Sequence, residues 1–389
     1  IMLTLIKGAD VFAPSPLGIQ DVLIAGTKIV DIQPEITIDT YQGITTVDGT
    51  HCILAPGFID SLVHITGGGG EAGFASRTPE MNLTDATLHG TTTVIAALGT
   101  DSSSRTHSNL IAKAKELKEL GLNVFCHSGS YHLPAKTLTG AITSDLMYID
   151  EFIGVGEVAI SDHRSSQPTV QQLAELAAEA KVAGMLSGKK GTVSIHVGPV
   201  DTHLSLLHEV DKLTDISLAQ FYPTHMNRNI DLLNAGVEFC KAGGTIDFTT
   251  STTEYDLAHG EYSAAHALAY CLENKVDPTK LTMSSDGHAS LPIFDKSYNL
   301  LGLEVGKEST LHGSFVEAVQ KYNVSIEHAL MAVTSNPAQI LGINKGVIKQ
   351  NADADLVLLD KTTLAPTECW SKGVHMVSRG KALVKGAFE

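Results

Sequence analysis

Short runs of apolar and β-branched residues recur through the middle of the chain, and helical patterns separate them. In segments 108–121 and 170–188, for example, apolar residues recur at helical spacing. We count eight strand-like runs: 56–64, 91–99, 123–129, 156–161, 192–198, 219–225, 244–251 and 281–287. Eight strand–helix units predict an α/β fold, a (β/α)8 barrel of the TIM type. A doubly wound sheet is the competing arrangement, but its usual glycine-rich phosphate loop is not seen here.

The two ends of the chain show a different pattern. They contain short strand-like runs separated by turns, such as 21–32, 37–49, 346–360 and 375–388. We predict that residues 1–54 and 350–389 together form one small β-sandwich domain, which flanks a barrel domain over residues 55–349.

The charge balance and the cysteines narrow the class of protein. The 389-residue chain carries 27 Lys and Arg against 43 Asp and Glu, a formal net charge of −16. This excess argues against nucleic acid and anionic membrane surfaces as partners. The 5 cysteines are scattered and form no C-x-x-C pair, as is typical of reduced thiols in the cytoplasm. We find no apolar run of transmembrane length and no signal peptide, so we expect a cytoplasmic enzyme or binding protein.

Candidate chemistry lies where the expected strands end, which is where TIM-type barrels place their active sites. The polar residues at these positions are His64, Thr100, His127, Tyr131, Glu157, His196, His225 and Asp286. Convergence of histidines and carboxylates is what a divalent metal site needs. Each residue also has an ordinary interpretation. A lone strand histidine is more often packed in the core, and Asp286 is also suited to cap the next helix.

The first strand carries only half of a common ligand pair. Metal-binding strands often place two histidines two residues apart, because such side chains point to the same face. Here His64 stands at the second position, but Leu62 stands at the first. The glycine run 67–70 that follows is either a flexible loop or a place where the backbone approaches a ligand closely.

Several segments resemble the amidohydrolase superfamily, and within it the isoaspartyl dipeptidases. The likeness covers nearly the whole chain and includes "GGGGE" (67–71), "SDHRS" (161–165), "PTHMNRN" (223–229), "SSDG" (284–287) and "NADADLVLLD" (351–360). The first three segments are specific to the subgroup. The resemblance implies a binuclear zinc site in the barrel. It also implies hydrolysis of the β-aspartyl isopeptide bond of isoaspartyl dipeptides by a metal-bound hydroxide.

The resemblance also implies site residues. It places metal ligands at His64, His196, His225 and Asp286, and a substrate pocket at Glu71, Thr100, Tyr131, Arg164, Arg228 and Ser290. A β-aspartyl dipeptide offers one ammonium, which suits Glu71, and two carboxylates, which suit the arginines. Tyr131 can donate a hydrogen bond to the carbonyl oxygen of the scissile bond. Asp286 can take a proton from the attacking water and pass it to the leaving amine. The alternative is that both arginines are surface salt-bridge partners.

Two positions depart from the family pattern. Leu62 replaces the first histidine of the His-x-His pair, and Glu157 stands on the strand where many members have a carboxylated lysine that bridges two metals. Glu157 either bridges two ions or holds only one. We expect one tightly bound zinc ion, with the ligands Glu157, His196 and His225. A second ion, at His64 and Asp286, is expected to be weak or absent, and His288 is an alternative source of the missing imidazole.

The leading hypothesis is therefore a metal-dependent β-aspartyl dipeptidase that acts on a small dipeptide, and we expect a homo-oligomer. Another amidohydrolase activity is the alternative, such as an N-acyl-amino-acid deacylase or a cyclic-amide hydrolase. A third hypothesis is a catalytically impaired homologue that binds a ligand. Leu62 supports that hypothesis, whereas Asp286, Tyr131 and the two arginines count against it.

Overall fold

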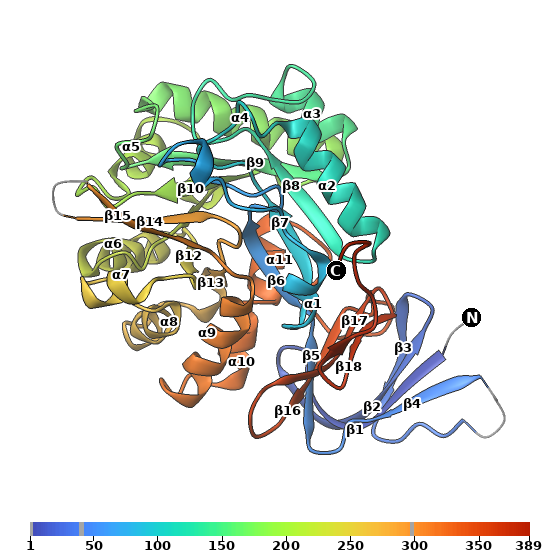
Figure 1. The fold of residues 1–389 in the computed structure, drawn as a ribbon. Coiled ribbons are helices and arrows are strands. Elements are labelled where there is room, and N and C mark those ends of the chain that lie inside the picture. Colours follow the sequence, from blue (N-terminus) through green and yellow to red (C-terminus); the bar gives the residue numbers. More distant parts are fainter. Residues whose placement is uncertain (1–2, 39–42, 296–298) are drawn as a thin grey trace.

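The main body of the protein is a barrel of parallel strands surrounded by helices (Figure 1). The structure, a computed structural model, describes residues 3–38, 43–295 and 299–389. The barrel strands are β6 Phe58–Val63, β7 Thr91–Ala96, β8 Asn123–Ser128, β9 Phe152–Ile160, β10 Thr192–Val197, β11 Phe221–Thr224, β12 Ile246–Thr249 and β13 Leu281–Ser284. Strands β6 to β11 pair in chain order, and β12 pairs with β13. Each strand falls on one of the strand-like runs, so the predicted barrel is confirmed.

Contacts across the two remaining seams close the barrel. Val63, at the end of β6, forms a parallel bridge with Gly287, just after β13. On the other side, the amide of Met226, after β11, donates to the carbonyl of Asp247 in β12. The buried Asp247 carboxylate also accepts a hydrogen bond from Thr224, at 2.6 Å. Because the strands are parallel and the barrel is closed, their carboxyl ends meet at one rim.

Helices cover the outside of the barrel. Those in the described part of the chain are α1 Leu83–Thr87, α2 His107–Glu119, α3 Ile142–Tyr148, α4 Val170–Ser187, α5 Ser205–Leu213, α6 Ile230–Lys241, α7 Glu254–Ala258, α8 Ala264–Glu273, α9 Ser309–Gln320, α10 Ile326–Met331 and α11 Ser335–Leu341. The predicted segments 108–121 and 170–188 correspond to α2 and α4. Helix α4 begins at a capping box formed by Thr169 and Gln172. It ends at Gly188, whose φ of 70° is a left-handed conformation that glycine adopts without strain.

A separate sheet built from both ends of the chain lies beside the barrel (Figure 1). Its strands in the described residues are β1 Leu3–Phe12, β2 Pro16–Ala25, β3 Lys28–Gln33, β4 Ile44–Asp48, β5 Cys52–Pro56, β16 Leu356–Asp360, β17 Pro366–Ser371, β18 Val374–Ser378 and β19 Lys381–Ala382. The two ends meet where β5 pairs with β1 on one side and with β16 on the other. The predicted small β-domain is thus confirmed, while its boundaries at residues 54 and 350 remain a prediction. Residues 39–42 of the strand-like run 37–49 lie outside the described residues.

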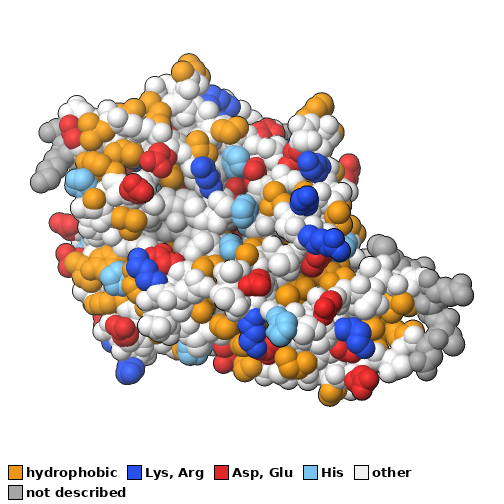
Figure 2. Space-filling view, turned by 60° about the horizontal axis from the view of Figure 1, so that its bottom comes forward, with side chains coloured by type: hydrophobic (Ala, Val, Ile, Leu, Met, Phe, Trp, Pro, Cys, Tyr) orange, Lys and Arg blue, Asp and Glu red, His pale blue; other side chains and the backbone are white. Residues whose placement is uncertain are grey.

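A hairpin of β14 Ser290–Phe294 and β15 Leu300–Val305 follows the eighth barrel strand. The hydrophobic pattern did not predict it. Its first strand starts directly after the loop that carries Asp286, so the hairpin forms part of the rim around the site. None of the helices in the described ranges is long and apolar enough to cross a membrane. On the face drawn in Figure 2, acidic, basic and hydrophobic side chains are interspersed, so the net charge of −16 is not gathered there in one acidic patch.

Candidate active site

The barrel rim brings histidines and carboxylates from five strands into two groups that share one residue. The first group is Glu157, His196 and His225, and the second is His64, Glu157 and Asp286. Within each group, one potential ligand atom per residue lies within 4.8 Å of the others, and all five side chains are buried. The metal ligands implied by the resemblance, together with Glu157, therefore lie in one place.

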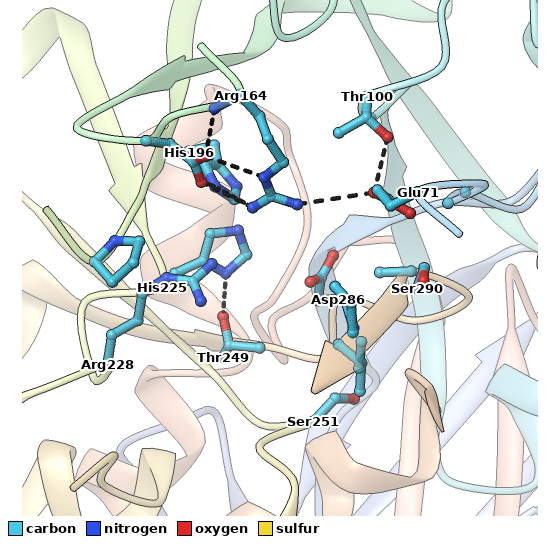
Figure 3. Close-up of a pocket in the computed structure, with 18 of the residues that line it drawn as sticks. Glu71, Thr100, Arg164, His196, His225, Arg228, Thr249, Ser251, Asp286 and Ser290 are labelled. Carbon is cyan, nitrogen blue, oxygen red and sulfur yellow. Dashed lines mark hydrogen bonds and ion pairs between the residues drawn. The ribbon is translucent and has the colours of Figure 1, made fainter. Parts of the chain in front are cut away.

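The first group is arranged around one oxygen of Glu157. Its Oε1 lies 3.0 Å from Nδ1 of His196 and 3.9 Å from Nε2 of His225. Nδ1 of His225 contacts the hydroxyl of Thr249 at 2.5 Å, which orients the ring (Figure 3). Burial and the neighbouring His196 lower the pKa of His225 to about 4, so this imidazole is neutral at pH 7. Neutral imidazole is the form that ligates a metal.

The second group is arranged around the other oxygen of Glu157. Nδ1 of His64 lies 3.0 Å from the carbonyl oxygen of Ala97, which only accepts, so Nδ1 donates. Nε2 of His64 therefore faces Oδ1 of Asp286 at 3.1 Å and Oε2 of Glu157 at 3.9 Å. Burial lowers the pKa of His64, but the hydrogen bond and charge of Asp286 outweigh burial and raise it to about 9.

The donors in both groups fit divalent cations. Oε2 of Glu157 is buried and has no hydrogen-bond partner in the described part of the chain. Burying such an oxygen is costly unless a positive group faces it. Imidazole nitrogens and carboxylate oxygens are also the ligand types that catalytic zinc takes. A cation that faces Oε2 of Glu157 would therefore satisfy an atom that the described part of the chain leaves without a partner.

The second group lacks the extra imidazole that the family pattern supplies. Leu62 is buried in β6, two residues before His64, and offers no ligand atom. His288 does not replace it, because its two ring nitrogens face the carbonyl of Pro79 and the side chain of Asp85 instead. The alternative that His288 completes this group is therefore not supported.

A cavity of about 260 Å³ opens above the two groups. The residues that the sequence analysis placed in the site all line this cavity, except His127 and Glu157, the latter of which is buried between the histidines. Figure 3 shows the side chains of Glu71, Thr100, Arg164, Asp286 and Ser290 around it. His127 does not line the cavity, and neither of its ring nitrogens has a hydrogen-bond partner in the described residues.

On one side of the cavity, charged groups hold one another in place. Arg164 makes two hydrogen bonds to Asp162, from Nε at 3.0 Å and from Nη2 at 2.8 Å. Its Nη1 lies 3.7 Å from Glu71, whose carboxylate also accepts a hydrogen bond from Thr100 at 2.9 Å (Figure 3). Burial raises the pKa of Asp162, but His196 and Arg164 outweigh burial and hold it well below its usual range.

Arg228 and Tyr131 also line the cavity, and each contacts a neighbour there. Nε of Arg228 donates to the carbonyl of Val197 at 2.9 Å, and its Nη1 lies 3.9 Å from Glu261. Burial raises the pKa of the Glu261 carboxyl to about 7. The hydroxyl of Tyr131 lies 2.9 Å from Nδ1 of His196.

Several residues of the site escaped the sequence analysis, and three of them contact its charged or metal-ligating side chains: Asp162, Thr249 and Glu261. Asp162 had a usable signal, since it stands two residues before Arg164 in the "SDHRS" segment and carries the charge that an arginine fork prefers. Thr249 ends β12 and Glu261 follows α7, and neither lies in a segment with a chemical signature. Only the closed barrel shows that they reach His225 and Arg228.

Comparisons with known proteins agree with this geometry. The amidohydrolase family model matches residues 53–383. A solved structure of β-aspartyl dipeptidase from Fervidobacterium islandicum AW-1, in complex with β-Asp-Leu dipeptide, is 40% identical with a TM-score of 0.92, and the match covers 98% of this chain and 97% of that chain. A second structure of β-aspartyl dipeptidase from the same organism is 38% identical with a TM-score of 0.89, over 98% of both chains.

A more distant curated relative bears a different name. Dihydroorotase from Pelotomaculum thermopropionicum is 24% identical over 99% of this chain and 96% of its own length. The match spans nearly the whole of both chains, and the named activities of the relatives differ. On the extent of the family match and on the barrel that carries these ligand groups, the chain belongs to the amidohydrolase family.

Proposed function

We propose that this chain is a metal-dependent hydrolase that cleaves the β-aspartyl isopeptide bond of isoaspartyl dipeptides. The observation that carries the proposal is one cavity in which Glu71, Arg164 and Arg228 surround the two metal-ligand groups. An isoaspartyl dipeptide presents one ammonium and two carboxylates, which match one carboxylate and two guanidinium groups. The similarity to the Fervidobacterium structures, one of them in complex with β-Asp-Leu, supports the same substrate class.

Each charged group has a role that its contacts favour. Thr100 holds the carboxylate of Glu71 at the cavity, where it is placed to bind the substrate ammonium. Asp162 fixes the guanidinium plane of Arg164, whose Nη1 lies at the cavity 3.7 Å from Glu71 and is placed to bind a substrate carboxylate. Arg228 uses Nε for the backbone of Val197, and its Nη1 is 3.9 Å from Glu261, too far for a hydrogen bond, so its terminal nitrogens suit the second carboxylate.

Two cation positions follow from the ligand groups. Glu157, His196 and His225 would hold one divalent ion, with zinc as the candidate, and His64 and Asp286 would hold a weaker one with Oε2 of Glu157. When bound, such an ion lowers the pKa of a water molecule and polarises the scissile carbonyl. Asp286 accepts the proton of the attacking water and delivers it to the leaving amine. Tyr131 donates to the carbonyl oxygen as negative charge develops there.

Steady-state kinetics in zinc-supplemented buffer test the proposal. We expect kcat/KM for β-Asp-Leu to exceed that for α-Asp-Leu by at least about 100-fold. With its ammonium and carboxylates bound by the charged groups, β-Asp-Leu places its peptide bond at the metal-ligand groups, whereas α-Asp-Leu does not. Arg228→Met should raise KM for β-Asp-Leu by about 10–100-fold without changing zinc content. Arg379→Met, outside the cavity, is the matched control. Equal turnover of the two dipeptides would contradict the proposed specificity.

A cyclic-amide hydrolase is the second candidate, and the similarity to a dihydroorotase favours it. Dihydroorotate carries a carboxylate but no ammonium, so it would offer Glu71 no positive group beyond the guanidinium of Arg164. Turnover of dihydroorotate in the absence of turnover of β-Asp-Leu would favour this candidate. Turnover of neither substrate would favour a catalytically impaired homologue.

A further inference from the structure

A third group of metal-ligating side chains lies outside the proposed active site. Asp85 lies in α1, His288 follows β13, and Glu308 immediately precedes α9. One potential ligand atom from each lies within 4.8 Å of the other two. Nε2 of His288 is 3.3 Å from Oδ2 of Asp85 and 3.6 Å from Oε1 of Glu308. Three segments far apart in the sequence thus place acceptor atoms around one point.

The hydrogen bonding of His288 directs a lone pair toward the two carboxylates. Nδ1 lies 2.9 Å from the carbonyl oxygen of Pro79, which only accepts, so Nδ1 carries a proton and donates. In the neutral ring, Nε2 is then an acceptor that faces the acceptor oxygens of Asp85 and Glu308. A histidine that ligates a metal usually donates its other ring N–H to a carbonyl or carboxylate in this way.

Glu308 is buried without a compensating donor. Its relative exposure is 2%, and its Oε1 has no hydrogen-bond partner in the described residues. Within the same residues, no lysine or arginine forms an ion pair with Asp85 or Glu308. The backbone leaves room for this carboxylate, because a Cβ atom at Gly287 would come within 2.2 Å of Oε1. Burial raises the pKa of this carboxyl to about 7, so its ionised form is costly unless a positive charge faces it.

A cation has access to the group from the surface. A pocket of about 360 Å³ is lined by Asp85, His288 and Glu308, together with His89. It is distinct from the cavity above the active-site groups, which none of these residues lines. The pocket is large enough for water molecules to complete the coordination of an ion.

We propose that Asp85, His288 and Glu308 bind a divalent transition-metal cation of the zinc type, separate from any ion in the active site. One imidazole nitrogen and two carboxylate oxygens, with water at the remaining positions, form a ligand set that zinc favours. The ion would tie α1 and the start of α9 to the loop that carries Asp286 and His288. The inference does not depend on which reaction the active site performs.

Equilibrium dialysis of the full chain against Zn²⁺, with bound zinc measured by elemental analysis, tests the inference. We expect Glu308→Gln and Asp85→Asn each to lose one zinc per chain or to bind that zinc at least about 100-fold more weakly, because each removes a direct ligand. Glu368→Gln is the matched control, since it breaks another histidine–carboxylate pair, with His375 at 2.6 Å. Its zinc isotherm should equal that of the unmodified chain.

The same loss of one zinc should appear in a His196→Asn background, in which the first active-site group is weakened. If Glu308→Gln does not fold, Asp85→Asn still decides the question, because the side chain of Asp85 is 35% exposed. Identical zinc isotherms for the unmodified chain and a folded ligand variant would overturn the inference. A lack of dipeptide hydrolysis would count against the proposed function instead and would leave this zinc count unchanged.

Discussion

Asp286 lies at the barrel rim, between His64 and the cavity. Its Oδ1 lies 3.1 Å from His64, and it lines the cavity. Burial raises its pKa, but His64 and His225 outweigh burial and lower the pKa below its ordinary value. The carboxylate is therefore ionised at pH 7 and able to accept a proton.

Asp286→Asn should lower kcat for β-Asp-Leu by about 10²–10⁴-fold with little change in KM, because it removes the proton acceptor at nearly constant shape. Stopped-time assays of product at saturating substrate measure this effect. Asp201→Asn, at an exposed position outside the cavity, is the control and should keep full activity. Near-normal turnover in Asp286→Asn would remove Asp286 from the mechanism.

Leu62 stands where the resemblance to isoaspartyl dipeptidases implies the first histidine of a His-x-His pair. It lies in β6, two residues from His64, so a histidine there would offer a second imidazole on the same strand. We expect Leu62→His to tighten the weaker of the two active-site zinc ions by at least about 10-fold in equilibrium titration. Leu62→Met keeps the apolar side chain and should leave zinc binding unchanged. Two equally tight active-site ions in the unmodified chain would show that the missing histidine is not needed.

At the scale of the elements, the barrel strands can be located from the sequence, whereas the hairpin β14–β15 cannot. The runs that form β6 to β13 are apolar and β-branched over most of their length, because strands of a closed parallel barrel are buried on both faces. Their positions are therefore visible in the sequence. The hairpin β14–β15 lacks that signal, since its second strand is largely exposed, and the hydrophobic pattern missed it.

Glu151 connects α2 to the start of β9 through two lysines. Its carboxylate accepts hydrogen bonds from Lys118 at 2.8 Å and from Lys115 at 3.1 Å. Burial raises the pKa of Glu151, but the lysines outweigh burial and lower it from 4.5 to about 2. The folded-state pKa lies below the ordinary value, so this stabilisation is fully present above about pH 4.5. It is lost as the pH falls toward 2.

Glu151→Gln should therefore lower the free energy of unfolding at pH 7 by about 1–2 kcal/mol, after allowance for solvent screening of the lysines. The difference from the unmodified chain should shrink between pH 4.5 and pH 2. Urea unfolding followed by circular dichroism at several pH values measures both effects. Glu119→Gln is the control, because Glu119 is exposed and lies in α2, the helix that carries both lysines. A difference that is constant over this range would show that the lysine contacts are not the cause.

At the scale of the whole molecule, a buried polar network holds the barrel to the β-domain. Asp355, just before β16, accepts hydrogen bonds from Lys345 at 2.7 Å and from Asn123 of β8 at 2.9 Å. The same Asn123 amide donates to the carbonyl of Thr92 in β7. Asp355 is 6% exposed, so water does not replace these contacts readily.

We expect Asp355→Ala to lower the free energy of unfolding by about 1–3 kcal/mol, because it removes an acceptor of the buried Asn123 amide and one of the two carboxylates that face Lys345. The other carboxylate is that of Asp353, at 2.6 Å. Chemical denaturation with Asp201→Asn as the surface control measures the change. Zinc content of the folded variant should stay unchanged, since the network lies away from all three ligand groups. A change below about 1 kcal/mol would mean that the two domains adhere through apolar contacts alone.

The sequence by itself determined the barrel, its helices and the residue types at the strand ends. Those features depend on periodicity and on short segments such as the one that contains His225 and Arg228, and both are local properties of the chain. The tertiary structure alone decided which distant residues meet. His288 faces Asp85 and Glu308 rather than His64, and Asp162 bridges Arg164 and His196. These contacts join residues from different strands and loops, and their distances follow from barrel closure and strand register, which no local pattern encodes.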